Sequence, residues 1–264
     1  MKIVVIGGTG LIGSRTVERL RRRGHDAVAA SPKTGVDTLN NLGLAEVLEG
    51  AAVVVDLADS PSYEEGAVMH FFETTARNLI AGELKAGVKH HVVLSIVGSE
   101  RLPDNPYFRA KMAQQRIVAS SPVPHTIIHS TQFFEFLPGI ADAATSDGVA
   151  RLSPAFVQPI AADDVADIIA TIATEQPQDA VVEIAGPGSF RLNEIVERYL
   201  QAIGDDRRVE PDVHARYFGA ELEELTLVPG GSPTMGHTSF PQWLARRRRP
   251  TREPATEPAS ALTN

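Results

Sequence analysis

The sequence contains no cysteine, which excludes disulfide bonds and thiolate chemistry. It has no apolar run long enough to cross a membrane and no internal repeat. Its net charge of -8 disfavours non-specific binding to nucleic acid, and its one basic cluster lies in a terminal segment at residues 246–249. We therefore expect neither a membrane protein nor a nucleic-acid-binding protein.

The composition fits one enzyme-sized unit, because 264 residues with 43% hydrophobic side chains can bury a large core around a single sheet. An apolar strand begins almost at the first residue and leaves no room for a signal sequence. We therefore expect the protein in the cytoplasm.

Three glycines spaced three apart, Gly7, Gly10 and Gly13, directly follow the first apolar run. A strand that turns abruptly into a helix leaves unpaired N–H groups and a partial positive charge, which suit a pyrophosphate. Gly7 permits the tight turn, Gly10 lets the backbone approach the phosphates, and Gly13 allows close helix packing. The pattern predicts a dinucleotide site; the alternative is a glycine-rich turn that binds nothing.

The end of the second expected strand, at residues 27–30, indicates which dinucleotide is bound. A carboxylate there would bind the adenine ribose 2′-hydroxyl, whereas a cation would meet a 2′-phosphate. Asp26 comes too early, while Ser31 offers a hydroxyl donor and Lys33 a positive charge. We expect NADP rather than NAD, unless Lys33 is only a solvated loop residue. The predicted contacts in this half of the chain are Gly7, Thr9, Gly10, Leu11, Ile12, Ser31, Lys33, Leu57, Ala58, Asp59 and Leu94. For Asp56 and Asp59, capping or turn formation is an equal alternative.

Apolar strands alternate with helical patterns along the chain. Strands are expected at residues 3–6, 27–30, 53–57, 89–97, 126–129 and 180–185, and helices at 14–23, 64–86, 106–119 and 162–173. This alternation predicts an α/β fold of Rossmann type, with a doubly wound parallel sheet and a small C-terminal substrate-binding lobe. We assign residues 1–245 to one NAD(P)-binding unit, with the core at 1–130 and 155–185 and the lobe at 131–154 and 186–245. Residues 246–264 lack apolar periodicity and are predicted to form a disordered tail.

Tyr107 and Lys111 lie four residues apart in an expected helix that begins with Asn105 as its cap and Pro106 as its first residue. They should share one helical face, where an ammonium would lower the pKa of the phenol and make it a proton donor to a carbonyl. Ser95, at the end of a strand, would orient the carbonyl oxygen. The alternative is that Tyr107 is a packed aromatic residue and Lys111 only binds ribose or solvent.

Four segments resemble the atypical short-chain dehydrogenases of the NmrA-like, NAD(P)H-binding type, and the resemblance extends over roughly residues 1–245. They are Gly-Gly-Thr-Gly-Leu-Ile-Gly at 7–13, Tyr-Phe-Arg-Ala-Lys-Met-Ala-Gln at 107–114, Thr-Gln-Phe-Phe-Glu at 131–135 and Pro-Ile-Ala-Ala-Asp-Asp-Val-Ala at 159–166. The resemblance implies NADP in the crevice, with Lys111 near the nicotinamide ribose. It also implies that residues 130–134, including Ser130 and Thr131, line the nicotinamide and substrate pocket.

The remaining candidates are aromatic residues and histidines. Phe133 and Phe134 are expected to form pocket walls for a flat substrate, with Phe136 in the core. His129, near the carboxyl end of its strand, could contact substrate or simply pack.

Two further pairs have structural interpretations. His90 and His91 point to opposite faces of a strand, so they cannot share a metal, and no metal site is predicted. Asp163 and Asp164 are expected to cap the following helix.

The sequence therefore predicts an NADPH-dependent reductase of a small, aromatic or conjugated carbonyl compound such as a ketone or quinone. Tyr107, Lys111 and Ser95 would form its catalytic group. The competing hypothesis is a non-catalytic, NADP(H) redox-sensing protein, and an isomerase or dehydratase that retains the nucleotide also stays open. The predicted partner is a small-molecule substrate, and the sequence leaves a homodimer open.

Overall fold

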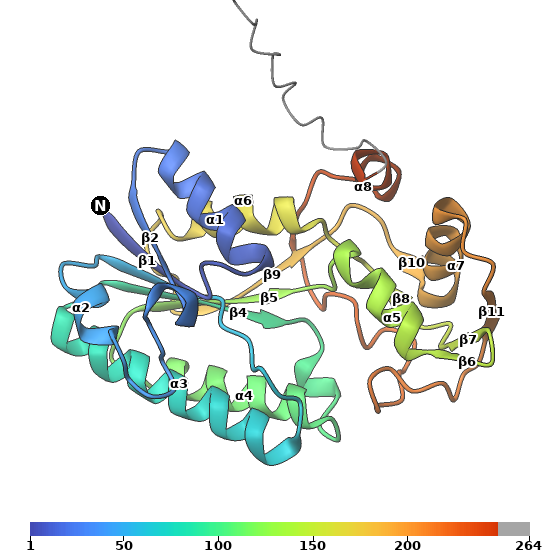
Figure 1. The fold of residues 1–264 in the computed structure, drawn as a ribbon, viewed down its shortest axis with the longest axis horizontal. Helices are drawn as coiled ribbons and strands as arrows, with labels where there is room; N and C mark the ends of the chain where they lie inside the picture. The colour runs from blue at the N-terminus through green and yellow to red at the C-terminus, as the bar shows by residue number, and fades with distance from the viewer. Residues whose placement is uncertain (248–264) are drawn as a thin grey trace, which may run out of the picture.

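A computed structural model describes residues 1–247 (Figure 1). Seven parallel strands form its main sheet. In spatial order they are β12 (Thr234–Met235), β9 (Ala180–Ala185), β5 (His125–Ser130), β4 (His90–Ile96), β3 (Val53–Asp56), β1 (Lys2–Ile6) and β2 (Asp26–Ala30). This arrangement confirms the predicted doubly wound α/β fold.

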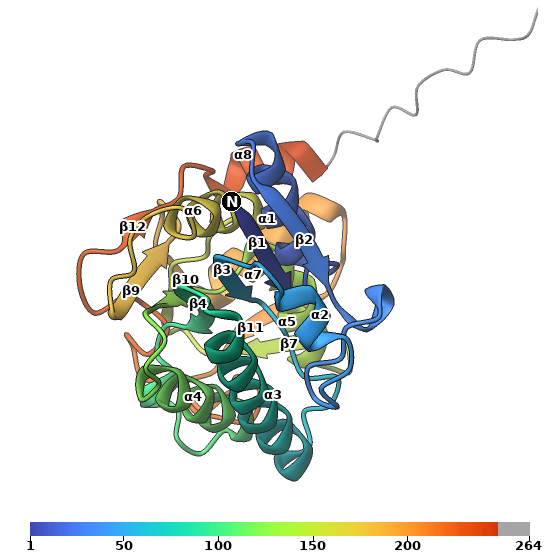
Figure 2. The same cartoon turned by 90° about the vertical axis from the view of Figure 1, so that its left-hand side faces the viewer.

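Helices cover both faces of the sheet, as Figure 2 shows. One face carries α1 (Leu11–Arg22) and α6 (Ala162–Ile172), and the other carries α2 (Leu44–Leu48), α3 (Glu65–Ala86) and α4 (Pro106–Ala119). Strands covered on both sides must be apolar on both sides. The first strand meets this requirement, since Ile3, Val4 and Val5 are fully buried.

The chain changes direction at β1. It runs outward to β2 and then returns to β3, which pairs with the opposite side of β1 through Ile3 and Val53. In open parallel sheets such a reversal leaves a crevice at the carboxyl ends of the strands, where ligands bind. The crevice therefore lies between the ends of β1 and β3.

A second group of elements packs around its own hydrophobic cluster, at the right of Figure 1. Its helices are α5 (Leu137–Ala143), α7 (Leu192–Ile203) and α8 (Phe240–Arg247), and its strands are β6 (Thr145–Ser146), β7 (Val149–Leu152), β8 (Phe156–Val157), β10 (Phe190–Arg191) and β11 (Arg208–Pro211). Short 3₁₀ helices occur at η1 (Pro32–Thr34), η2 (Ser99–Arg101) and η3 (Phe134–Phe136). We call the helices α5, α7 and α8, together with these five short strands, the distal elements.

Two boundaries differ from expectation. β12 lies in a segment assigned to the lobe, yet it extends the main sheet beside β9. Asp164 explains this placement, because its carboxylate accepts hydrogen bonds from the backbone N–H groups of His237 (2.8 Å) and Thr238 (2.7 Å). Arg246 and Arg247, expected in the tail, belong to α8; the rest of the predicted tail lies outside the described residues.

Within residues 1–247, no helix is both long enough and apolar enough to cross a membrane.

Candidate functional site

The turn between β1 and α1 forms a cradle that only glycine can build. Gly7 has a φ of +70°, and a Cβ there would lie 2.5 Å from the carbonyl oxygen of Leu57. A Cβ on Gly13 would lie 2.1 Å from the carbonyl oxygen of Gly7, so Gly13 allows α1 to pack against the turn itself. The helix begins after Gly10 with no side-chain cap and no acidic residue in its first turn. Its N–H groups and positive end therefore suit a pyrophosphate.

Gly8 is a further requirement that sequence reasoning missed. A Cβ on this residue would lie 2.6 Å from the carbonyl oxygen of Val5 and 2.7 Å from the Cα of Ala29. Its N–H also donates to the carbonyl oxygen of Ala30 (3.2 Å). The turn is thus fixed against β2 as well as against the residue that follows β3. In the sequence, the only sign of this requirement is that Gly8 directly follows another glycine.

The end of β2 is polar and carries no adjacent carboxylate. Ser31 is buried, and its hydroxyl accepts a hydrogen bond from the Thr9 hydroxyl (3.0 Å). Lys33 is exposed in η1 and makes no ion pair or hydrogen bond within residues 1–247. Asp26 lies at the opposite end of the strand, in register with Lys2. The structure thus brings Thr9 and Ser31 together, and the exposed Lys33 follows Ser31 by two residues.

The loop after β3 is shaped by Asp56, which is 1% exposed. One carboxylate oxygen accepts from the N–H of Ala58 (3.1 Å), and the other accepts from the side-chain amide of Gln114 (2.8 Å). Asp56 therefore serves turn formation, one of the two roles that the sequence allowed. It holds Leu57 and Asp59 at the edge of the crevice.

Lys111 is the buried cation of the site, with 4% of its surface exposed. Its ammonium donates to the carbonyl oxygen of Leu94 (2.8 Å) and to the side-chain oxygen of Gln114 (2.5 Å), and it lies 4.6 Å from the ring centroid of Phe72. It forms no ion pair within the described part of the chain. Burial lowers the pKa of Lys111 to about 8, although the charges of Asp56 and Asp59 oppose this shift.

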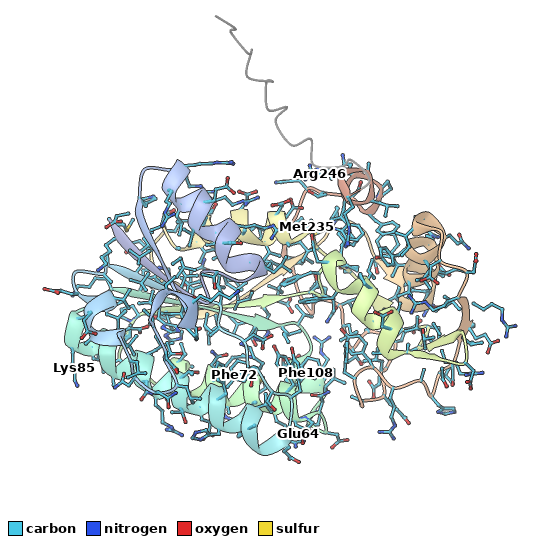
Figure 3. All side chains as sticks on the ribbon, in the orientation of Figure 1. Glu64, Phe72, Lys85, Phe108, Met235 and Arg246 are labelled. Carbon is cyan, nitrogen blue, oxygen red and sulfur yellow. The ribbon has the colours of Figure 1, made fainter. Side chains whose placement is uncertain are left out.

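Tyr107 differs from expectation. Its hydroxyl donates to the carboxylate of Asp59 (2.9 Å), and its ring packs against Tyr63 and the edge of Phe72, which lies below the sheet in Figure 3. Burial and the charge of Asp59 raise the pKa of Tyr107. The expectation that Lys111 lowers this pKa is wrong, because the ammonium bonds Leu94 and Gln114 instead. The expected capping of α4 is confirmed, since the Asn105 side chain accepts from the N–H groups of Tyr107 and Phe108.

Ser95 and His129 are neighbours on adjacent strands and are joined through Gln115 of α4. The Gln115 amide donates to the Ser95 hydroxyl (2.6 Å), and its oxygen lies 2.7 Å from Nε2 of His129. Ser95 is 2% exposed, so it faces the helix layer rather than the open crevice. Burial lowers the pKa of His129, so this half-buried imidazole is neutral at pH 7.

At the carboxyl end of β5, two hydroxyl groups bond to the backbone. Ser130 donates to the carbonyl oxygen of Thr131 (2.9 Å), and Thr131 donates to that of Gln158 (2.7 Å). Gln132 follows them and is only 7% exposed, yet both polar atoms of its amide lack a hydrogen-bond partner within residues 1–247. Sequence reasoning did not single it out, although it lies inside the 131–135 motif.

Phe133 and Phe136 form an aromatic pair after β5. Phe133 stacks on Phe136, with ring centroids 5.1 Å apart, and Phe136 is 50% exposed. The expectation that Phe134 forms a pocket wall is wrong, because its side chain is fully buried among the distal elements against Phe240 and Trp243. The ring that stacks on Phe133 is therefore that of Phe136, not that of Phe134.

A strained turn from the distal elements meets the start of α4. Phe218 has a φ of +46°, which is rare for a large side chain, and its ring is 55% exposed. Its carbonyl oxygen accepts a hydrogen bond from the Asn105 side chain (2.7 Å), and its ring contacts Tyr217 edge-on. This position could not be found from the sequence, because a phenylalanine does not predict a left-handed conformation.

The histidine pair has separate partners. His90 lies 2.9 Å from the Thr126 hydroxyl, whereas His91 lies 2.7 Å from the carboxylate of Glu83. Their side chains point to opposite faces, as expected from strand geometry.

The two aspartates of α6 do not cap it as expected. The N–H of Ala162 donates instead to Glu135 (3.0 Å), while Asp163 pairs with Arg19 (2.9 Å). Asp164 accepts from the segment that carries β12.

Comparison with known proteins agrees with this geometry. The chain matches the family described as NAD(P)H-binding over residues 7–176. It is 22% identical over 227 residues to the photosystem II assembly factor Ycf39 of Synechocystis sp., covering 79% of this chain and 70% of that protein. It is 28% identical over 231 residues to the chloroplastic divinyl chlorophyllide a 8-vinyl-reductase of Arabidopsis thaliana, covering 71% of this chain. The chain spans about half, 54%, of that second relative.

Among solved structures, MoeE5 in complex with UDP-glucose and NAD has a TM-score of 0.72 at 18% identity, covering 93% of this chain and 96% of that one. At this identity the likeness concerns the fold. The glycine cradle, the uncapped start of α1 and the family match over residues 7–176 lead to one conclusion. The chain belongs to the NAD(P)H-binding family.

Proposed function

We propose that this protein is an NADPH-dependent reductase that transfers a hydride to a small aromatic or conjugated carbonyl compound, above all a quinone. The observation that carries this proposal is Lys111, a buried cation at the crevice without an ion pair in the described chain. Such a cation is costly in a protein interior and marks a functional-site candidate. Lys111 fits the hydroxyl groups of the nicotinamide ribose. A bound nicotinamide would supply the hydride.

The end of β2 supports NADPH over NADH. Lys33 offers an exposed ammonium that has no ion pair within residues 1–247, and Ser31, two residues earlier, offers a hydroxyl, whereas no carboxylate follows the strand directly. A 2′-phosphate would gain charge and hydrogen bonds from these groups, and a ribose 2′-hydroxyl would miss its usual acceptor.

The aromatic residues at the crevice favour a flat hydride acceptor whose reduction needs no tyrosine as proton donor. Phe133 and Phe136 form a stacked pair in which Phe133 is buried and Phe136 is 50% exposed. The Tyr107 hydroxyl already donates to Asp59, and its pKa is raised, so it is poorly suited to give up a proton. Quinones fit this arrangement better than simple ketones, because water can supply the proton after hydride transfer.

Nicotinamide fluorescence tests the cofactor assignment. The cofactor-free protein is titrated with NADPH and NADH, with NADP⁺ as competitor. We expect NADPH to bind at least tenfold more tightly, about 1.4 kcal/mol. Lys33→Glu should abolish this preference. Lys89→Glu is the matched control, since Lys89 is exposed directly before β4, at the amino ends of the strands. Equal affinities for the two nucleotides would refute the phosphate site, and binding of neither would refute the function.

Turnover tests the reaction itself. Steady-state oxidation of NADPH is followed with a series of quinones and aromatic ketones. If hydride transfer limits the rate, NADPH deuterated at C4 should slow it. Lys111→Met should raise the KM for NADPH, because the ribose contact is lost.

A second candidate is an NADP(H)-sensing protein without turnover. The bond between Tyr107 and Asp59 favours it, because it joins the crevice loop to α4 and leaves no free phenol. A relative named as an assembly factor is compatible with this role. A kcat/KM of about 10⁴ M⁻¹s⁻¹ or more for any acceptor would exclude it. Different affinities for NADPH and NADP⁺ with no turnover would favour it over the reductase.

A further inference from the structure

The side-chain amide of Gln132 is an unsatisfied donor and acceptor in a buried position. The residue is 7% exposed, and neither its oxygen nor its nitrogen has a hydrogen-bond partner within residues 1–247. Buried polar groups in folded proteins are almost always hydrogen-bonded, so an amide with two free ends calls for a partner.

The backbone around Gln132 is fixed and cannot move to satisfy the amide. Its carbonyl oxygen accepts from the N–H of Ile160 (2.9 Å), and the carbonyl oxygen of Ile160 accepts from the N–H of Phe134 (3.0 Å). On the other side, the N–H of Thr131 donates to the carbonyl oxygen of Ile184 (3.0 Å). Only the side-chain torsions of Gln132 remain free to place the amide.

A second glutamine in the same region shows the ordinary arrangement. Gln158, in the segment that pairs with residues 131–132, donates from its side-chain amide to the carbonyl oxygen of Gly186 (2.8 Å). A structural glutamine here therefore finds a backbone partner, and Gln132 does not. The difference indicates that the partner of the Gln132 amide lies outside residues 1–247.

The position of Gln132 narrows the identity of this partner. It follows the carboxyl end of β5, next to the end of β4, where the N–H of Val97 donates to the carbonyl oxygen of Ser130 (2.9 Å). It directly precedes Phe133, whose ring forms the stacked wall with Phe136. Ligands of parallel sheets bind at this edge.

We propose that Gln132 binds the carboxamide group of the nicotinamide. A carboxamide offers one carbonyl oxygen and one NH₂ group, and a glutamine amide offers the same two groups in reverse, so the pair can form two hydrogen bonds. The proposal requires only a rotation of the Gln132 side chain toward the crevice, since the backbone on either side is held by its own hydrogen bonds. The two bonds would set which face of the nicotinamide ring meets the acceptor beside Phe133. This inference rests on the proposed function.

The assignment is tested by measuring how tightly the variant Gln132→Met binds three nucleotides. The substitution keeps the length of the side chain but removes its amide. NADPH carries the carboxamide, 2′,5′-ADP lacks the whole nicotinamide half, and the 3-acetylpyridine analogue of NADPH carries a methyl group in place of the NH₂. We expect the variant to bind NADPH about tenfold or more weakly and 2′,5′-ADP with unchanged affinity. The natural protein should prefer NADPH to the analogue, and the variant should lose this preference.

Thermal unfolding of the cofactor-free proteins gives a readout independent of nucleotide binding. Gln132→Met should melt about 2 °C or more above the natural protein, because it removes an unsatisfied buried amide. Gln158→Met, the matched control, should melt lower, since it breaks a hydrogen bond that the structure contains.

Three results would overturn the proposal. They are an unchanged affinity of Gln132→Met for NADPH, an equal loss of affinity for NADPH and 2′,5′-ADP, and a lower melting temperature of the cofactor-free variant. An unchanged NADPH affinity with a raised KM for the quinone would assign the amide to the acceptor carbonyl instead. If the natural protein binds 2′,5′-ADP but oxidises no NADPH with any acceptor, the proposed reductase activity is refuted. The contact between Gln132 and the carboxamide is then still decided by the affinity of Gln132→Met for NADPH.

Discussion

Replacing His91 by leucine tests the buried pair that joins α3 to β4. Nδ1 of His91 lies 2.7 Å from a carboxylate oxygen of Glu83, and both side chains are fully buried. Removal of the imidazole leaves a carboxylate in the interior with no partner. Breaking such a pair costs about 3–5 kcal/mol, whereas replacing both members by apolar residues is often close to neutral. We therefore expect His91→Leu to lose about 3–5 kcal/mol of unfolding free energy, and Glu83→Leu with His91→Leu to lose much less.

The same pair predicts how stability depends on pH. Burial alone lowers the pKa of His91, but the charge and hydrogen bond of Glu83, together with the charge of Asp56, raise it above its usual value. A raised folded-state pKa means that the native protein binds more protons than the unfolded chain from about pH 6.5 up to the folded-state pKa. The contribution of His91 is complete below that pH and is lost as the pH rises through the folded-state pKa.

Urea unfolding followed by circular dichroism at pH 6 and at higher pH checks both statements. The free energy lost in His91→Leu should be largest at pH 6 and should shrink as the pH rises. His70→Leu is the control, since His70 is an exposed histidine of α3. A loss below about 1 kcal/mol, or a double variant as unstable as the sum of the two single variants, would refute the account of a buried ion pair.

Three further variants examine the site. Tyr107→Phe should change the kcat for quinones less than threefold, because the hydroxyl is already bonded to Asp59; a larger loss would restore tyrosine as the proton donor. Gly13→Ala should weaken NADPH binding more than tenfold, because the added Cβ would lie 2.1 Å from the carbonyl oxygen of Gly7. Gly66→Ala is the control and should leave binding unchanged, because a Cβ added there would have no atom within 4 Å. Phe218→Asn should raise the unfolding free energy by about 1 kcal/mol, because asparagine tolerates a φ of +46°; Phe218→Leu should not, and an equal gain in both would contradict strain at this position.

The glycine cradle and the alternation of strands and helices along the chain could be predicted from sequence because both depend on local patterns. Gly7 and Gly13 stand where a turn and a close approach require them, and Asn105 caps the helix that it was expected to cap. Apolar runs bounded by helical patterns were sufficient to predict a parallel sheet covered on both faces.

The roles of Tyr107 and Phe134 could not be predicted, because they depend on residues distant in sequence. Tyr107 meets Asp59, 48 residues earlier in the chain, and Phe134 meets Trp243 in the last described helix. A four-residue spacing places Tyr107 and Lys111 on one face but does not fix where either polar end points. Gln132 escaped notice for a similar reason, since a missing partner is visible only once the surrounding packing is known.

Trp243 is the only tryptophan of the chain, and the structure connects it to the crevice. Its indole N–H donates to Glu135 (2.9 Å), whose other oxygen holds the start of α6, and its ring packs against Phe134. Glu135 lies between Phe133 and Phe136 in the sequence, so a shift of either ring can reach the indole through a single residue. The protein therefore carries its own optical reporter, since tryptophan emission responds to hydrogen bonding and overlaps the absorption of reduced nicotinamide. Quenching of that emission during a titration would follow occupancy of the crevice without any label.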